Sequence, residues 1–286
     1  YDTGLADICD KISSGYDFKY DLAEILSNLT CSRILSPSSK LSSFEYMHSF
    51  IEKPSFSLHD IYRALDVLDR ESDSIQSMLY EKSRGARNTS VLYYDCTNFF
   101  FEIEEEKGLR KYGKSKEHRP NPIVNMGLFL DGDGIPLAFT IFSGNGNEQP
   151  TLIPLEKKIL NDFRLSKFII CTDAGLASNA NRKFNSRQDR SYVVTQPLKK
   201  LKEHIRKWAL DTKGFHLDNS STEYDISDID EHLHKDSVFF KERWVNEDGI
   251  EQRLIVSYCP KHRMYQREVR NRQIERAEKI IEGGKR

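Results

Sequence analysis

Two aspartates in apolar, strand-like runs are the residues of this chain best suited to chemistry. Asp95 lies within the run VLYYDCTNFFF, and Asp173 closes the run KFIICTD. Apolar and aromatic residues on both sides of Asp95 predict a strand buried on both faces. A carboxylate buried there must be paired, hydrogen-bonded or bound to a metal. A backbone amide or an arginine would satisfy Asp95 without any catalytic role, and from this run alone that alternative stays open.

A shared metal site is the chemistry that the two acids could perform together. Asp173 ends its strand, where ligands gather in open α/β sheets, and adjacent strands would bring Asp95 beside it. Carboxylate oxygens are the ligands that Mg²⁺ and Mn²⁺ prefer. Carboxylates on neighbouring strands can hold two such ions about 3.5–4 Å apart, which activate a hydroxyl and stabilise the leaving oxygen of a phosphodiester. We therefore expect Asp95 and Asp173 to be metal-binding catalytic residues, with Mg²⁺ or Mn²⁺ as cofactor.

A basic loop follows the strand that carries Asp95. Its glycines, Gly108 and Gly113, predict a mobile segment, and its cations suit sequence-independent contacts with nucleic-acid phosphates. A solvated loop without a partner is the alternative. The candidate DNA-binding residues are Lys107, Arg110, Lys111, Lys114, Lys116, His118 and Arg119.

The elements before the first acid are predicted to be helical. Residues 1–88 form an N-terminal helical region, in which Ser57 and Asp60 resemble a capping box. The apolar stripe between Ile61 and Leu79 predicts one long helix after that cap. Such a module could bind DNA, dimerise, or simply pack as a helical subdomain.

From residue 89 onward the order of elements predicts an α/β fold. Residues 124–142 read as a hairpin with its turn at Asp131 to Gly134. We interpret the aspartates there as turn-forming residues and not as calcium ligands. A helix follows from Thr151, then the strand ending in Asp173 and a short strand at 191–196. We therefore predict a mixed sheet flanked by helices. Its domain spans residues 89–286 and holds a β-rich insertion at about 209–259, followed by a charged helix at 261–282.

Composition excludes several classes of protein. The 286 residues carry a formal net charge of −1, so DNA binding must come from local patches. The five cysteines are scattered without a Cys-x-x-Cys spacing, which argues against a disulfide framework and for a reducing compartment. No apolar run is long enough to cross a membrane. The chain begins at Tyr1, and we expect it to be a piece of a longer protein.

Four segments of the chain resemble the DDE transposases of bacterial insertion sequences. They are YYDCTNFFFE, YGKSKEHRPNP, GLFLDGDGIPLAFTIFSGNGNEQPT and KFIICTDAGLASNANRKF. The resemblance covers about residues 20–280 and implies a ribonuclease-H-like core with a β-rich insertion before the last acid. It implies metal-dependent cleavage and transfer of DNA strands at the terminal inverted repeats of a mobile element, with Asp95 as the first catalytic acid and Asp173 as the second.

The resemblance also implies partners and a location. Double-stranded DNA would be bound both as terminal inverted repeats and as target. We expect a homodimer in the synaptic complex, no membrane partner, and a place in the bacterial cytoplasm with the nucleoid.

The third acid is where the chain departs from this family. The family places a glutamate after the β-rich insertion, on a helix with a Tyr, Arg, Glu, Lys pattern, and no such pattern occurs before Arg286. Tyr265 and Glu268 resemble it only superficially, and Glu275 and Glu278 read as solvated. The third catalytic residue is therefore unknown, and we expect this chain alone to be inactive or very weak. A non-catalytic DNA-binding or multimerising remnant, or a ribonuclease-H-like nuclease without strand transfer, are the alternatives.

Overall fold

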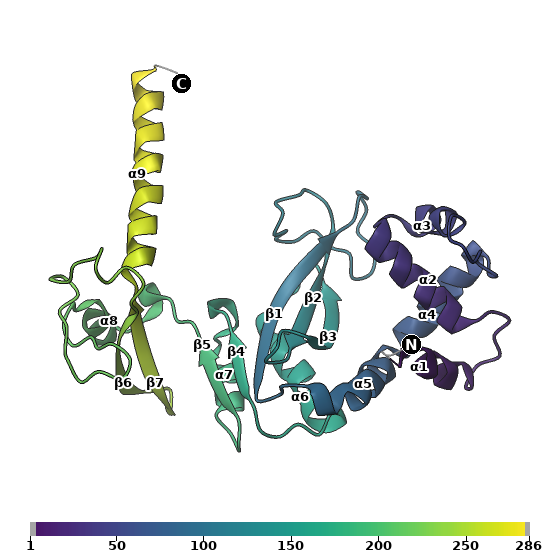
Figure 1. Ribbon diagram of the computed structural model, residues 1–286, viewed down its shortest axis with the longest axis horizontal. Helices are drawn as coiled ribbons and strands as arrows, with labels where there is room; N and C mark the ends of the chain where they lie inside the picture. Colours follow the sequence, from purple (N-terminus) through teal and green to yellow (C-terminus); the bar gives the residue numbers. More distant parts are fainter. Residues whose placement is uncertain (1–3, 284–286) are drawn as a thin grey trace. The chain divides into compact units, whose positions relative to one another are not determined.

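The computed structural model describes residues 4–283, which divide into two compact units (Figure 1). The first unit comprises residues 1–194 and the second residues 195–286. The first contains the N-terminal helices and a five-stranded sheet, and the second contains a two-stranded sheet and a long helix. Both candidate acids belong to the first unit.

The chain begins with helices that have their own core. They are α1 (Leu5–Ser13), α2 (Leu22–Leu35), α3 (Lys40–Met47), α4 (Leu58–Arg70) and α5 (Ser72–Ser83). The capping box at α4 is confirmed, because Ser57 Oγ accepts from Asp60 N and Asp60 Oδ2 accepts from Ser57 N. The prediction of one long helix after it is wrong, because the chain leaves helical geometry at Glu71 (φ −91°, ψ 6°). The break separates α4 from α5. Ile75 and Leu79 of α5 still pack against the core that α4 helps to form, while Tyr80 of α5 belongs to the core of the sheet.

Five strands form the mixed sheet that the sequence predicts. They are β1 (Val91–Phe100), β2 (Ile123–Leu130), β3 (Pro136–Ser143), β4 (Ile169–Thr172) and β5 (Ser191–Val194), in the order β3-β2-β1-β4-β5. The first three strands pair antiparallel, whereas β4 runs parallel to β1 and β5 runs parallel to β4. Helices α6 (Leu152–Asp162) and α7 (Asn179–Asn185) complete the unit. The predicted α/β fold, a mixed sheet flanked by helices, is therefore confirmed.

Helices of this unit cover one face of the sheet. The core behind that face joins Leu92, Tyr94 and Cys96 of β1 to residues of α5 and α6. The alternate residues of β1, Tyr93, Asp95 and Phe99, are exposed. The prediction that this strand is buried on both faces is therefore wrong, because aromatic residues also occupy its open face.

The turn between β2 and β3 is held by a buried aspartate. Asp131 is fully buried, and its Oδ1 accepts hydrogen bonds from the backbone of Asp133 (3.1 Å) and Ile135 (2.9 Å). Its Oδ2 pairs with Arg87 Nη1 at 3.2 Å, and the same nitrogen donates to Pro136 O. Asp131 therefore stabilises the turn and its link to the segment before β1, as the interpretation of turn chemistry predicts.

The side chain of Tyr94 in β1 packs closely against Gly127 of the neighbouring strand β2. Its ring packs on Phe129 with 4.7 Å between centroids, and its hydroxyl lies 2.7 Å from Thr151 Oγ1. A Cβ on Gly127, opposite Cys96 in β2, would lie 2.1 Å from the Tyr94 hydroxyl. Burial raises the pKa of Tyr94, so the hydroxyl stays protonated. Glycine is therefore required in β2 so that β1 can bind the start of α6.

The second unit is built around a hairpin and a short helix. Its elements are α8 (Glu203–Leu210), β6 (Phe239–Glu247), β7 (Ile250–Tyr258) and α9 (Pro260–Glu282). Lys241 of β6 is buried and donates to the carbonyl of Trp208 at 2.7 Å, with its ammonium 4.7 Å from the Phe215 ring centroid. The lysine therefore closes the C-terminal end of α8, where carbonyls lack helical partners.

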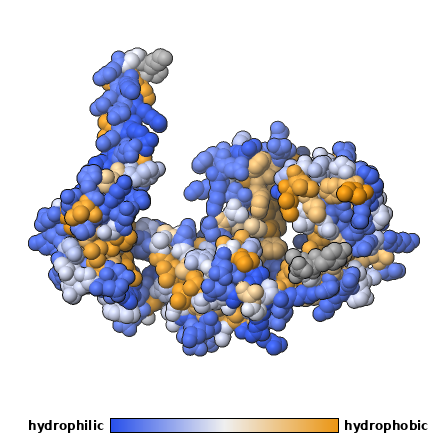
Figure 2. All heavy atoms as spheres, in the orientation of Figure 1, coloured by the Kyte–Doolittle hydropathy of each residue, from blue (hydrophilic) through white to orange (hydrophobic). Residues whose placement is uncertain are grey.

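The long helix α9 is exposed along nearly its whole length. Pro260 is its one buried residue within the described part, and Figure 2 shows the helix as a mostly hydrophilic surface with a few hydrophobic patches. Within residues 4–283 no helix combines the length and the apolar character needed to span a bilayer.

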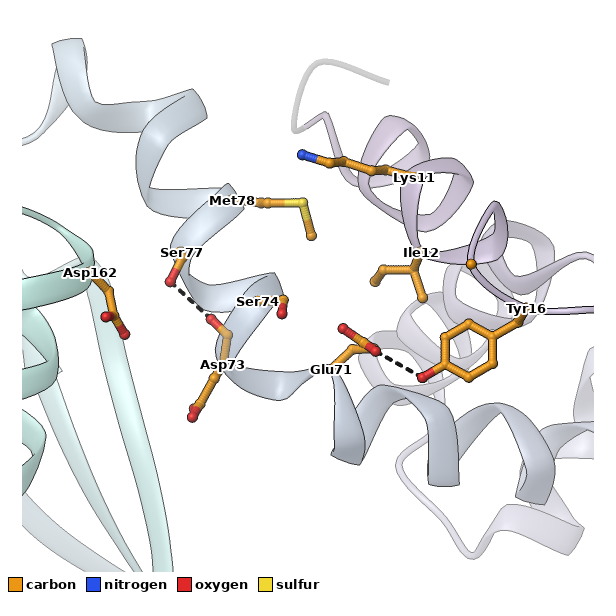
Figure 3. A pocket seen from close by; sticks show the side chains of 10 residues that line it. Lys11, Ile12, Tyr16, Glu71, Asp73, Ser74, Ser77, Met78 and Asp162 are labelled. Atoms are coloured by element: carbon orange, nitrogen blue, oxygen red, sulfur yellow. Dashed lines mark hydrogen bonds between the residues drawn. The ribbon is translucent and has the colours of Figure 1, made fainter.

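A groove of about 720 Å³ lies between α1 and the start of α5, beside Asp162 at the end of α6 (Figure 3). Tyr16 donates from its hydroxyl to Glu71 Oε1 at 2.8 Å across one end of it. Neither Asp95 nor Asp173 lines this groove. The candidate chemistry therefore lies elsewhere, at the surface of the sheet.

Replacing Gly127 by alanine tests the close packing of the Tyr94 side chain against β2. We expect Gly127→Ala to lower the stability of the first unit by about 1–3 kcal/mol, because the new methyl group must displace a buried phenol. Both tryptophans, Trp208 and Trp244, lie in the second unit, so the measurement is hydrogen exchange of β1 and β2 peptides against urea. Gly85→Ala is the matched control, because a Cβ there would meet nothing within 4 Å. Equal stability of the two variants would contradict the argument.

Candidate metal site

The register of two parallel strands brings the predicted acids together. β1 and β4 are neighbours, and Tyr94 pairs with Thr172, the last residue of β4. Asp95 and Asp173 each come one residue later, and the backbone of Asp173 is still extended (φ −78°, ψ 177°). Neighbouring strands lie about 4.8 Å apart, and paired residues in them point to the same face. The two carboxylates therefore lie side by side on the open face of the sheet.

Asp95 is exposed, with 76% of its side-chain surface accessible. Its Oδ1 accepts a hydrogen bond from the backbone nitrogen of Cys96 at 2.8 Å. Its Oδ2 lies 4.0 Å from Lys116 Nζ. The carboxylate is therefore solvated and needs no buried partner. The expectation of such a partner assumed that both faces of β1 are buried.

Asp173 caps the turn that follows β4. Its Oδ1 accepts hydrogen bonds from the backbone of Gly175 (3.0 Å) and Leu176 (3.2 Å), within a short 3₁₀ turn that begins at Ala174. These two bonds fix the side chain against its own backbone. The second oxygen, Oδ2, accepts no hydrogen bond within residues 4–283.

Two amide side chains that the sequence analysis missed hold this turn in place. Gln149 donates from Nε2 to Gly175 O at 2.9 Å. Asn181, nearly buried in α7, donates to Gln149 O at 3.1 Å and to Leu176 O at 2.8 Å. Both residues therefore position Asp173 indirectly. Gln149 lies in a segment quoted for the family resemblance, and that segment was the available signal.

A buried polar cluster lies one helical turn further along α7. Asn185 donates from Nδ2 to Glu156 Oε2 of α6 at 2.9 Å, and Arg190 Nε lies 3.9 Å from Glu156 Oε1. Burial raises the pKa of the Glu156 carboxyl to about 7, against the opposing effects of Asn185 and Arg190. This cluster joins α6 and α7 to Arg190, the residue before β5.

The donor set at the two acids fits a hard divalent cation. Asp95 and Asp173 each present an Oδ2 that accepts no hydrogen bond within the described residues, and carboxylate oxygens are the preferred ligands of Mg²⁺ and Mn²⁺. Asp95 and Asp173 would hold the ion, and each has its other oxygen fixed by backbone amides. Between residues 4 and 283 no three His, Cys, Asp or Glu side chains gather to hold a metal ion.

The glutamates considered for a third acid lie in the second unit. Glu268, Glu275 and Glu278 are all on α9 and are exposed, as is Tyr265. The expected solvation of Glu275 and Glu278 therefore holds.

The basic loop after β1 is more ordered than its glycines predict. Lys111 forms a backbone bridge with Ile123, the first residue of β2. Glu106 accepts from the backbone of Tyr112 at 2.7 Å and pairs with Lys111 Nζ at 3.2 Å. A Cβ on Gly113 would lie 2.0 Å from Gly144 O, so the loop also packs closely on the end of β3. The prediction of a mobile segment is wrong in this part, because backbone pairing and close packing fix it.

The cations of this loop differ in their surroundings. The guanidinium of Arg119 lies 4.1 Å from the Phe100 ring centroid and that of Arg110 lies 5.5 Å from the Phe101 ring centroid. Lys107, Lys114, His118 and Arg119 are exposed. Among the predicted DNA-binding residues in the described part, Lys116 alone has an ion pair with Asp95 or Asp173.

Apolar side chains surround the two acids on the open face. Tyr93 and Phe99 flank Asp95 along β1, and Phe139 of β3 pairs with Leu128, the partner of Asp95 in β2. Phe139 and Val193 of β5 are both exposed. The site is therefore an acidic pair in an apolar surface, with the basic loop at its side.

Comparisons with known proteins do not assign the chain to a family. Its sequence matches no protein-family model and no curated protein. A structure of the piggyBac transposase synaptic complex with hairpin DNA matches with a TM-score of 0.39 and 10% identity, covering 90% of this chain and 60% of that one. A Mos1 transposase paired-end complex with the left transposon end matches with a TM-score of 0.28 and 12% identity, covering 68% and 70%.

A Mos1 mariner paired-end complex with Mn matches in the same range, with a TM-score of 0.26, 12% identity and coverage of 68% and 71%. The chain thus spans 60% of the length of the piggyBac chain that it matches. At these scores the fold assignment rests on the strand order and registers described above.

Removing the Asn181 side chain tests its support of the Asp173 turn. We expect Asn181→Ala to leave the carbonyls of Gln149 and Leu176 without a donor, at a cost of about 1–3 kcal/mol. The turn amides of Gly175 and Leu176 should then exchange faster in a hydrogen-exchange measurement. Asn161→Ala, at an exposed position of α6, is the control. Unchanged exchange in the turn would exclude a positioning role for Asn181.

The raised pKa of Glu156 predicts how stability depends on pH. The folded state keeps the proton at pH values where the unfolded chain has lost it, so stability falls as pH rises from about 5 toward 8. The loss is of the order of 3 kcal/mol for a shift from 4.5 to about 7. We expect Glu156→Gln to flatten this dependence, measured by hydrogen exchange of α6 and β4 at several pH values. Exposed Glu45→Gln should keep the wild-type slope; an unchanged slope in Glu156→Gln would contradict the assignment.

Proposed function

We propose that this chain is part of a DDE-type transposase of a bacterial insertion sequence, with Asp95 and Asp173 as two of its metal-binding catalytic acids. The observation that carries the proposal is the register of β1 and β4, which sets two exposed carboxylates side by side in a ribonuclease-H-like sheet. The segments that resemble the family contain both acids, Gln149 and the part of the basic loop from Tyr112 onward. The reaction class is therefore metal-dependent cleavage and transfer of DNA strands.

The residues of the site would have different roles in metal binding, positioning and DNA contact. Asp95 and Asp173 would hold Mg²⁺ or Mn²⁺ on the open face, and a bound ion supplies an activated hydroxyl and stabilises the leaving oxygen. Gln149 and Asn181 would keep Asp173 in place. The exposed cations of the loop, including Lys107, Lys114 and Arg119, would contact the phosphate backbone of double-stranded DNA. Apolar residues around the acids limit the access of water once DNA covers the face.

The partners follow from the same proposal. The complete gene product would bind the terminal inverted repeats of its element and a target DNA, as a homodimer that holds two ends together in the bacterial cytoplasm. The third acid would be supplied from outside the first unit.

Replacing either acid by its amide tests the proposal in the complete gene product. The substrate is a duplex that carries the ends of the element flanking the gene. We expect Asp95→Asn and Asp173→Asn each to abolish Mg²⁺-dependent strand cleavage, since an amide is a poor ligand, and to leave binding of the duplex nearly unchanged. Asp133→Asn, an aspartate of the β2–β3 turn, is the control and should cleave normally.

The outcomes separate the proposal from its alternatives. Cleavage that survives in both variants would refute the metal assignment. Cleavage without joining of the ends to a target plasmid would identify a nuclease, and binding without any cleavage by the wild type would identify a DNA-binding remnant.

A further inference from the structure

The edge of β1 that faces β4 loses its strand partner at the site. Ser90 O accepts from Ile169 N at 2.9 Å, so the backbone groups of the even-numbered residues of β1 point toward β4. β4 ends at Thr172, opposite Tyr94. Cys96 is the next even-numbered residue, and its N–H and C=O therefore point to a side with no strand.

Two charged side chains occupy these backbone groups. The N–H of Cys96 donates to Asp95 Oδ1 at 2.8 Å, and Lys116 Nζ donates to Cys96 O. The same ammonium lies 4.0 Å from Asp95 Oδ2. Asp95, Cys96 and Lys116 thus form a closed ring of contacts at the point where β1 and β4 part.

The position of Lys116 is fixed by the loop and not only by charge. Asn98 of β1 accepts from Lys116 N at 3.3 Å and donates from Nδ2 to Lys114 O at 3.4 Å. The buried Ser115 Oγ accepts from Glu117 N at 3.2 Å. The side chain of Lys114, two residues before Lys116, has no hydrogen bond or ion pair within residues 4–283. The loop therefore presents one lysine to the site and leaves its neighbour in solvent.

We propose that Lys116 is the resident counter-ion of Asp95, which a divalent cation displaces and which then binds a phosphate of the DNA strand at the site. The proposal rests on the proposed function, because it takes Asp95 and Asp173 as the ligands of that cation. An ammonium and a divalent cation cannot both remain within about 4 Å of one carboxylate oxygen without repulsion. Displacement frees the ammonium beside the strand that the site cleaves.

Lys116 is on this view a positioning residue that couples metal binding to DNA binding. Without metal it neutralises Asp95 and lowers the affinity of the site for cations. With metal it becomes available to a phosphate. The other exposed cations of the loop lack this dependence, because they contact neither acid.

The first test measures Mn²⁺ binding in the absence of DNA, by electron paramagnetic resonance of the free ion. We expect Lys116→Met to bind Mn²⁺ roughly 5- to 20-fold more tightly than the wild type, because a repelling charge at about 4 Å is removed. Lys116→Arg should bind nearly as the wild type does. Lys114→Met removes an equal charge from the same loop and should change the affinity less than twofold. Wild-type affinity in Lys116→Met would overturn the proposal.

Asp95→Asn separates failure of this proposal from failure of the proposed function. If Asp95→Asn binds Mn²⁺ as well as the wild type, the metal site itself is wrong. If Asp95→Asn loses binding while Lys116→Met resembles the wild type, only the role of Lys116 is wrong. Absence of binding in the wild type and in Lys116→Met up to several millimolar Mn²⁺ would overturn both.

The second test measures binding of a random-sequence duplex in Mg²⁺ and in EDTA at equal ionic strength. We expect Lys116→Met to weaken binding about 3- to 10-fold in Mg²⁺ and less than twofold in EDTA, where Asp95 still holds the lysine. Lys114→Met should weaken binding by a similar factor in both. An equal loss for Lys116→Met in both buffers would show an ordinary phosphate contact and overturn the coupling.

Discussion

The early end of β4 is the constraint on which the site depends. β4 pairs with β1 over only four residues, and the partner strand ends one residue before both acids. Because it ends there, Asp173 is free to cap a turn, and the backbone groups of Cys96 bond to the side chains of Asp95 and Lys116 instead of to a strand. A longer β4 would pair those groups. The chemistry of the open face thus follows from a termination in the sheet.

Different interactions hold the two acids in place. Asp95 is carried by a long central strand, whose other face is locked by Tyr94 over Gly127 and by the core beneath it. Asp173 lies at a strand end, and side-chain amides of Gln149 and Asn181 provide the restraint that strand pairing no longer gives. Packing fixes one acid, and hydrogen bonding fixes the other.

Much of the fold could be predicted from local patterns. The alternation and turn residues between 124 and 142 predict the hairpin, and the cap at Ser57 marks the start of α4. The side of β1 that faces solvent could not be predicted, because Tyr93 and Phe99 are apolar and yet exposed. The break at Glu71 was missed because the apolar stripe continues across it: Ile75 and Leu79 of α5 pack against the same core as Ile61 of α4.

The acids of the site could be named from the sequence, but their supports could not. Asp95 and Asp173 each end or interrupt an apolar run, which is a local signal. Gln149, Asn181 and Lys116 act through contacts with residues 20 or more positions away. Such contacts depend on strand order and on the course of a loop, and neither can be read from one segment of sequence.

The contact between α5 and β3 has a consequence for the solubility of the sheet. β3 is an edge strand, and the buried Gln76 of α5 accepts the outward N–H of Phe139 at 2.8 Å. The strand at the other edge, β5, is only four residues long. Exposed, long edge strands are templates for pairing with other chains. Gln76 occupies one outward N–H of β3, and β5 is too short to offer a long row of backbone groups, so both edges are poor templates for such pairing.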